Sequence, residues 1–112
     1  MQRDRLFVEE MISAAERARE LSADVTLDEL EHDQLRRDAL LWNFTVLGEA
    51  ASKVSDDLKA RHPEVGWRRP ADTRNRIIHG YWSIDLEILY TTANDQLGGL
   101  VKALRAVLDG MS

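Results

Sequence analysis

The side chains of this protein that could carry out chemistry gather in one stretch of eight residues. Arg74, Asn75, Arg76, His79 and Tyr81 bring together two guanidinium groups, an amide, an imidazole and a phenolic hydroxyl. An arginine fork matches the oxygens of a phosphate, and a histidine imidazole exchanges protons near neutral pH. The rest of the sequence consists mostly of the core and surface residues of amphipathic helices. If the protein is an enzyme, this stretch is its predicted site.

These side chains suit the cleavage of an RNA phosphodiester. His79 could act as general base on a ribose 2′-hydroxyl, or as general acid on the leaving 5′-oxygen. Arg74 could stabilise the charge that builds on the non-bridging oxygens, and Asn75 could orient the imidazole or the phosphate. The residues expected to follow the RNA backbone are Arg68, Arg69 and Arg76. Such cleavage needs no metal or cofactor, and the sequence contains no cluster of metal-ligating residues.

The distribution of charge agrees with an anion site at the same place. The net charge of −5 argues against a general nucleic-acid-binding protein. Residues 1–58 carry seven basic and fourteen acidic side chains, whereas residues 59–79 carry six basic and two acidic ones. This basic island includes the reactive stretch, which favours a local anion site over a solvated loop with chance arginines.

Length and composition indicate one small domain, residues 1–112. There is no cysteine, so disulfides and thiolate metal sites are excluded. No apolar run approaches the roughly 18 residues of a membrane span, and the N-terminus lacks the apolar core of a signal peptide. We expect a cytoplasmic protein with no membrane partner.

The sequence predicts an all-α fold, an antiparallel bundle of four or five helices. The expected helices cover residues 4–21, residue 26 into the 50s as the longest helix, 70–80, and 83 to the C-terminal region. Thr26 and Glu29 form a capping box for the second of these, and Pro70 is expected at the first position of the third. The pair Gly98-Gly99 is expected to kink or divide the last helix.

The long helix has two apolar stripes, roughly 120° apart on its surface. They consist of Leu40, Phe44, Leu47, Ala51, Val54 and Leu58, and of Leu35, Ala39, Trp42, Val46 and Ala50. A helix that is apolar on two faces requires two partners. One is the core of the domain, and we expect the other to be a second subunit.

The predicted site has a geometric requirement of its own. On a helical wheel Arg74 falls between Ile77 and Ile78, which are expected to face the core, so the arginine needs a charged partner or a subunit boundary. His79 lies about 140° from Arg74 on the same wheel. The two can converge only at the helix end near Gly80 or across a dimer axis. We therefore expect the site in a cleft between two subunits.

The pattern Arg74-x4-His79-x-Tyr81 resembles the signature of the HEPN superfamily, and specifically of its HepT toxins. Further similar segments are Gly48–Ala51, Pro63–Trp67 and Ser83–Glu87, so the likeness covers roughly residues 40–90. Two segments depart from the family pattern. Residues 71–73 are more polar than expected before the arginine, and Gly98-Gly99 stands where a proline often breaks the last helix.

The resemblance implies a dimeric helical bundle with a metal-independent endoribonuclease site in the shared cleft. It implies that the protein is the toxin of a bacterial or archaeal toxin–antitoxin pair. Arg74 and His79 would be catalytic and Asn75 supporting. The partner would be an MntA-like nucleotidyltransferase antitoxin, which transfers AMP from ATP to the motif tyrosine, here Tyr81. The added bulk and negative charge would oppose binding of an RNA backbone.

Two other interpretations remain open. The domain could be a non-catalytic HEPN module that binds a nucleotidyltransferase partner or a nucleotide, in which case loss of His79 would leave partner binding intact. It could also be a purely structural bundle, with Tyr81 and Trp82 as core aromatics beside a turn. The structural interpretation ranks last, because it leaves the clustered arginines, histidine and tyrosine unexplained.

Overall fold

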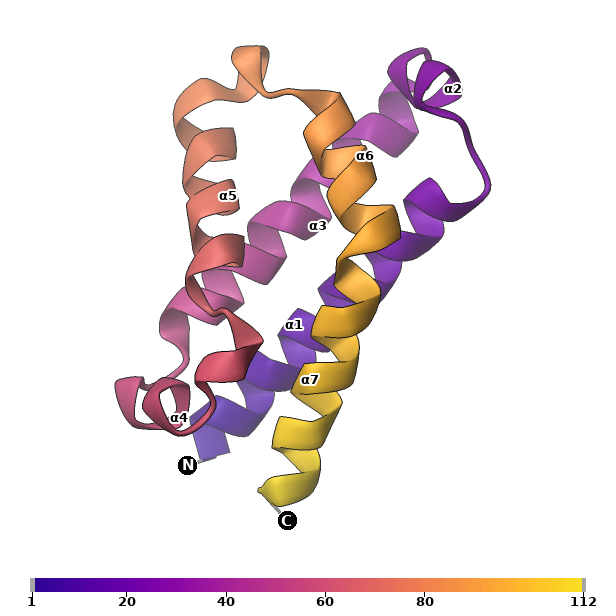
Figure 1. The fold of residues 1–112 in the computed structure, drawn as a ribbon. Helices are drawn as coiled ribbons and strands as arrows, with labels where there is room; N and C mark the ends of the chain where they lie inside the picture. The colour runs from indigo at the N-terminus through magenta and orange to yellow at the C-terminus, as the bar shows by residue number, and fades with distance from the viewer. Residues whose placement is uncertain (1, 112) are drawn as a thin grey trace.

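The computed structural model describes residues 2–111. This part of the chain forms seven α-helices and two short 3-10 helices, joined by short loops. They are α1 (Gln2–Ala23), α2 (Leu27–Glu31), α3 (Gln34–Lys53), α4 (Asp56–Arg61), η1 (Pro63–Val65), α5 (Arg68–Gly80), η2 (Tyr81–Ser83), α6 (Leu86–Asp95) and α7 (Leu97–Gly110). Residues 2–111 contain no strand, so the all-α prediction is confirmed. Five of the helices have ten or more residues and form the bundle (Figure 1). None of the helices in this part of the chain is both long and apolar enough to span a bilayer.

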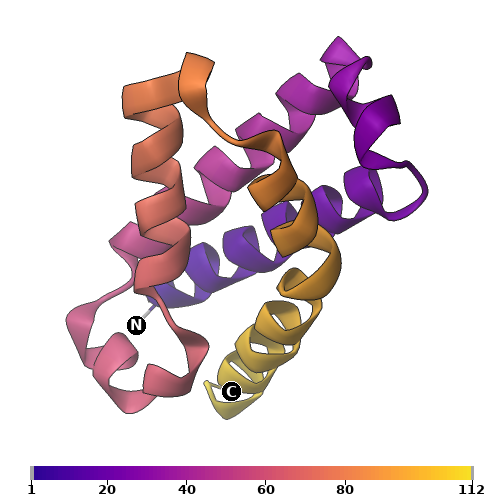
Figure 2. The ribbon, with the colours of Figure 1, turned by 45° about the horizontal axis from the view of Figure 1, so that its top comes forward.

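Helices α1 and α3 run antiparallel and form the centre of the bundle (Figure 1). Helix α5 packs mainly on α3, and α6 and α7 pack mainly on α1, so that α5 and the α6–α7 pair stand on opposite sides of α3 (Figure 2). The first apolar stripe of the long helix is buried at this centre, where Phe44 and Leu47 of α3 are nearly fully buried and Met11 and Ala18 of α1 are fully buried. Burial of these apolar side chains is the main force that holds the helices together.

The capping box of Thr26 and Glu29 is present, with both of its hydrogen bonds formed. The helix that it opens is nevertheless short. Helix α2 ends at Glu31, and the side chain of Asp33 accepts a hydrogen bond from Arg36 N at 3.1 Å to cap the separate helix α3. The long segment expected from residue 26 is therefore divided, and α1, with 22 residues, is longer than α3, with 20.

Helix α5 begins at Arg68, so Pro70 lies in its first turn rather than at its first position. Proline is tolerated there because the first N–H groups of a helix have no intrahelical acceptor. The helix ends at Gly80, as expected. Helix α6 begins after Asp85, whose side chain accepts a hydrogen bond from Glu87 N at 2.9 Å. The division of the last helix lies at Gln96, two residues before the glycine pair.

A buried carboxylate ties the beginning of α1 to the loop between α3 and α4. Asp4 is 3% exposed and accepts hydrogen bonds from Ser55 N at 2.9 Å and Ser55 Oγ at 2.6 Å. Burial alone would raise the pKa of Asp4, but the hydrogen bonds from Ser55 outweigh it and bring the pKa below 3.8. The Ser55 hydroxyl in turn accepts from Leu58 N and caps α4.

Candidate functional site

Gly48 allows α5 to approach α3 very closely. A Cβ atom at this position would lie 2.3 Å from both the Arg74 Cβ and the Pro70 carbonyl oxygen. No real side chain fits in that space, so a glycine is required for this packing. The close approach places Arg74 against α3, beside the residue that follows the glycine.

That residue, Glu49, is the partner of Arg74. Arg74 Nη1 donates a hydrogen bond to Glu49 Oε2 at 3.0 Å, and the arginine side chain is only 22% exposed. The predicted need for a partner is thus met by α3. Arg74 Nε is buried and has no hydrogen-bond partner within residues 2–111.

The two isoleucines beside Arg74 have different environments. Ile77 is 4% exposed and packs into the core, as predicted. Ile78 is 54% exposed, so the prediction that it faces the core is wrong. The reason is the direction in which α5 faces α3: the helix buries Pro70 and Ile77, and Ile78 lies 100° further round, on the flank of the helix.

His79 is exposed and lines a cavity of about 430 Å³ that Arg74 does not reach. This cavity lies where α5, η2 and α6 meet, and Thr73 and Arg76 also line it. Asn75 and Arg68 are exposed on α5. Within one chain, Arg74 and His79 therefore serve different surfaces, in agreement with their separation on the helical wheel.

Tyr81 occupies a third environment. Its hydroxyl donates a hydrogen bond to Asp38 Oδ1 at 2.9 Å, and the side chain is 40% exposed, so it is not a core aromatic. The side chain of Trp82 lies outside the described part of the structure. The hydrogen bond to Asp38 and the negative charge of that carboxylate raise the pKa of Tyr81 above 10.0, so the hydroxyl keeps its proton at neutral pH. The tyrosine borders a cavity of about 620 Å³ lined by α2, α3 and the start of α6.

Exposed apolar side chains lie beside the hydrogen bonds to Glu49 and Asp38. Leu35 and Trp42, one heptad apart on α3, are 85% and 66% exposed, and Ile78 on α5 is 54% exposed. The bond to Glu49 lies one heptad beyond Trp42, and the bond to Asp38 lies between Leu35 and Trp42. We call this surface the α3–α5 face. Of the other residues in the second predicted stripe, Ala39 and Val46 are half-buried and Ala50 is buried, so the exposed surface is narrower than the stripe.

The sequence did not point to Glu49 and Asp38 as partners. They lie 25 and 43 residues from the side chains that they bind, so no local pattern links them. Glu49 does belong to the segment Gly48–Ala51 that carries part of the family resemblance, whereas nothing in the sequence marks Asp38. Within residues 2–111 no three His, Asp or Glu side chains are grouped in a way that could hold a metal ion.

An all-α bundle whose α5 carries an arginine and a histidine, followed directly by a tyrosine, agrees with the class of protein to which the comparisons lead. A family model described as Ribonuclease HepT-like matches residues 11–107. The chain therefore belongs to the HepT-like ribonuclease family of the HEPN superfamily, and the prediction of this family and its ribonuclease class is confirmed.

Curated relatives agree with this assignment. The probable ribonuclease HepT of Thermococcus cleftensis is 27% identical over 94 residues, which cover 84% of this chain and 86% of that protein. Two proteins of Methanocaldococcus jannaschii whose names call them RNases are 27% and 24% identical, over 76% and 90% of this chain and 70% and 93% of theirs. No solved structure matches the chain significantly.

Proposed function

We propose that this protein is a metal-independent endoribonuclease that acts as a homodimer and is the toxin of a toxin–antitoxin pair in the cytoplasm. Membership of the HepT-like ribonuclease family is the observation that carries this proposal. The presence of Arg74 and His79 on α5, with Tyr81 directly after it, supports the proposal.

In the proposed reaction, His79 and Arg74 divide the work between proton transfer and charge stabilisation. His79 removes the proton of a ribose 2′-hydroxyl as that oxygen attacks the phosphorus, or gives a proton to the 5′-oxygen as it leaves. Arg74 binds the non-bridging oxygens through the terminal N–H groups that Glu49 does not occupy. Asn75 is proposed to support these groups, and Arg76 to contact the RNA backbone.

A dimer that uses the α3–α5 face would resolve the separation of Arg74 from His79. Exposed apolar patches rimmed by polar groups are typical of subunit interfaces. Arg74 and Tyr81 are at the rim of this face, and His79 follows its exposed residue Ile78. If a second copy packs there, His79 of one subunit can approach Arg74 of the other across the two-fold axis.

Tyr81 is the proposed site of neutralisation. An MntA-like nucleotidyltransferase antitoxin would transfer AMP from ATP to its hydroxyl, which is partly exposed and borders an open cavity. The transfer adds a bulky anion beside the motif, where an RNA phosphate would be repelled.

The experiment that tests the ribonuclease proposal is RNA cleavage by the purified protein in excess EDTA. We expect the wild type to cleave single-stranded RNA or tRNA, and His79→Ala and Arg74→Ala to lose at least about 100-fold in rate, the usual contribution of a general acid or base or of a charge-stabilising donor. His32→Ala is the matched control, because His32 is an exposed histidine at the end of α2, remote in sequence from the motif. Circular dichroism would verify that each variant is folded.

Full cleavage by both motif variants would contradict the proposed roles. If the wild type cleaves neither RNA while it still binds a nucleotidyltransferase, the second interpretation, a non-catalytic partner-binding module, replaces the ribonuclease proposal.

A further inference from the structure

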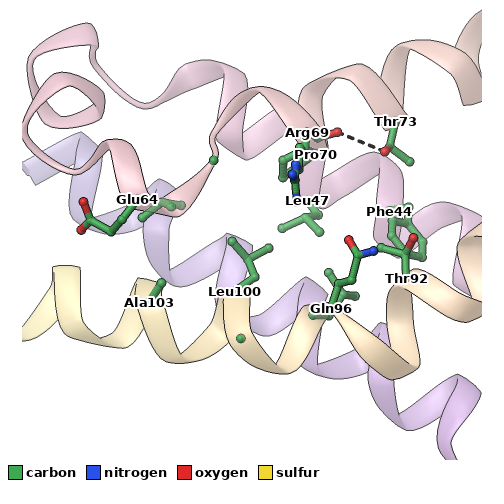
Figure 3. A pocket seen from close by; sticks show the side chains of 14 residues that line it. Phe44, Leu47, Glu64, Arg69, Pro70, Thr73, Thr92, Gln96, Leu100 and Ala103 are labelled. Atoms are coloured by element: carbon green, nitrogen blue, oxygen red, sulfur yellow. Dashed lines mark hydrogen bonds between the residues drawn. The ribbon is translucent and has the colours of Figure 1, made fainter.

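A cavity of about 190 Å³ lies between α5 and the junction of α6 with α7, away from the α3–α5 face (Figure 3). Its floor and walls are apolar and are formed by residues of α3, η1, α5, α6 and α7. These include Phe44, Leu47, Val65, Pro70, Leu97 and Leu100. The volume is smaller than the roughly 300–1,000 Å³ of sites for whole small molecules. The cavity therefore suits one flat ring rather than a complete cofactor or a folded segment.

The rim of this cavity is polar and can form hydrogen bonds in both directions. Gln96 rises from the junction of α6 with α7 into the gap, with Thr92 beside it (Figure 3). An amide side chain both donates and accepts, which matches the edge of a nucleobase. On the opposite wall, Thr73 Oγ1 donates to the Arg69 carbonyl oxygen at 3.0 Å, so its lone pairs remain available to accept a hydrogen bond.

The cavity adjoins the one at His79, because the two share a lining residue. Thr73 lines both this cavity and the one that His79 and Arg76 border. Arg69, Thr73 and Arg76 follow one another at i, i+4 and i+7 on the same face of α5. About 15 Å of helix separates Arg69 from His79 at 1.5 Å per residue. This face therefore presents a line of two cations and a hydroxyl that leads from the cavity to the proposed general acid or base.

The charges favour an anionic strand along this line. In residues 2–111 no ion pair is formed by Arg69 or Arg76, and the one acid on the rim of the cavity, Glu64, is exposed, with its Oε2 3.3 Å from His62 Nδ1. The cavity beside Tyr81 instead has a charged lining that is mainly acidic. Its lining includes four acidic side chains, Glu31, Asp38, Asp85 and Glu87, and a single cation, Arg37. Asp85 also lines the cavity at His79, where it is the one acid beside the cation Arg76. An RNA backbone is attracted to the first surface and repelled by the second.

We propose that the cavity between α5 and the α6–α7 junction is a nucleobase subsite, which holds a base of the RNA next to the phosphate at His79. This inference depends on the proposed ribonuclease function for the phosphate, but the subsite can be tested by binding alone. The base packs on the apolar floor, its edge faces Gln96 and Thr73, and the backbone passes along Arg69 and Arg76.

Gly99 offers a means to close the cavity without disturbing the fold. It lines the cavity, and a Cβ added there meets no atom within 4 Å. The variant Gly99→Leu places an apolar side chain over the cavity, and leucine is the better helix former. Gly110→Leu is the matched control, because it makes the same substitution in the same helix at a position that also has open space and does not line the cavity.

The test compares the binding of two probes to protein that carries His79→Ala, which prevents cleavage. The probes are a short fluorescein-labelled single-stranded RNA and a fully abasic oligonucleotide of the same length. We expect the parent protein and Gly110→Leu to bind the RNA about tenfold more tightly than the abasic strand, the preference that a single base contact gives. Gly99→Leu should lose this preference and still bind the abasic strand.

The other outcomes separate the subsite from the proposed function. Equal preference for bases in Gly99→Leu and the parent protein would overturn the subsite, even if the wild type cleaves RNA. Base-dependent binding that Gly99→Leu abolishes, in a protein whose wild type cleaves no RNA, would leave the subsite standing and refute the ribonuclease. A cavity that binds no base but whose closure abolishes binding of the antitoxin would be a protein-docking site, contrary to our proposal.

Discussion

At the scale of single residues, the motif divides into three environments. Arg74 is held by Glu49, Tyr81 is held by Asp38, and His79 is exposed at a cavity of its own. A fixed arginine and an exposed histidine agree with the proposed roles, because the charge-stabilising group must be positioned before the reaction and the proton carrier must reach the substrate.

A prediction about a single residue concerns the Tyr81 hydroxyl, the proposed acceptor of AMP. When the protein is incubated with ATP and the proposed nucleotidyltransferase antitoxin, intact-mass spectrometry should show the addition of AMP to the wild type and none to Tyr81→Phe. The other tyrosine, Tyr90, provides the control, because its hydroxyl is engaged with the Val25 carbonyl oxygen at 2.6 Å. Tyr90→Phe should therefore be modified like the wild type. AMP on Tyr81→Phe would show that the acceptor is another residue.

The types and spacing of the motif residues were readable from the sequence, but their partners were not. Ion pairs and hydrogen bonds between α3 and its neighbours depend on how two helices pack, and the residues involved lie tens of positions apart. The same limit explains Ile78. The periodicity of α5 placed it beside Ile77, and only the packing direction shows that one is buried and the other exposed.

At the scale of elements, the apolar periodicity predicted the helices well and their boundaries less well. The side-chain cap at Asp33 and the 3-10 helix at Tyr81–Ser83 are local competitions between hydrogen-bonding patterns, which hydrophobic spacing does not reveal. The close crossing of α3 and α5 was also hidden. Gly48 reads as an unfavourable residue inside a helix until the atoms that surround it are known.

The variant Gly48→Ala tests whether this crossing positions the site. A methyl group there would overlap the Arg74 Cβ and the backbone of Pro70, so α5 must move away from α3. We expect the free energy of unfolding, measured by urea denaturation, to fall by about 1–3 kcal/mol or more. Gly99→Ala is the control and should be neutral or stabilising by up to about 1 kcal/mol, since its methyl group enters open space. A Gly48→Ala protein as stable as the wild type would mean that the two helices tolerate a wider crossing.

At the scale of the whole molecule, opposite sides of α5 are suited to different partners. One flank carries Arg74 and Ile78 and belongs to the apolar α3–α5 face. The other flank carries Arg69 and Arg76 and borders the cavities. An antiparallel bundle could be predicted from the number of helical segments and their short connections. The assignment of one side to a subunit and the other to RNA required the exposure of each residue.

The proposed dimer leads to a prediction that connects assembly with activity. Trp42 is the largest exposed side chain of the α3–α5 face, and a buried tryptophan at the centre of an interface is a frequent hot spot. We expect Trp42→Asp to weaken dimerisation by about thirtyfold or more, the effect of losing about 2 kcal/mol, as measured by size-exclusion chromatography with light scattering over a range of concentrations. Cleavage of RNA should fall with the dimer fraction, because the cleft then lacks one of its two subunits.

Leu6→Asp is the matched control for this substitution. Leu6 is also apolar and 53% exposed, but it belongs to α1 and not to the α3–α5 face, so its variant should remain dimeric and active. A Trp42→Asp protein that stays dimeric would place the interface elsewhere. A monomeric Trp42→Asp protein that cleaves RNA as fast as the wild type would show that one chain holds a complete site, and His79 would then have to act without an Arg74 from the partner.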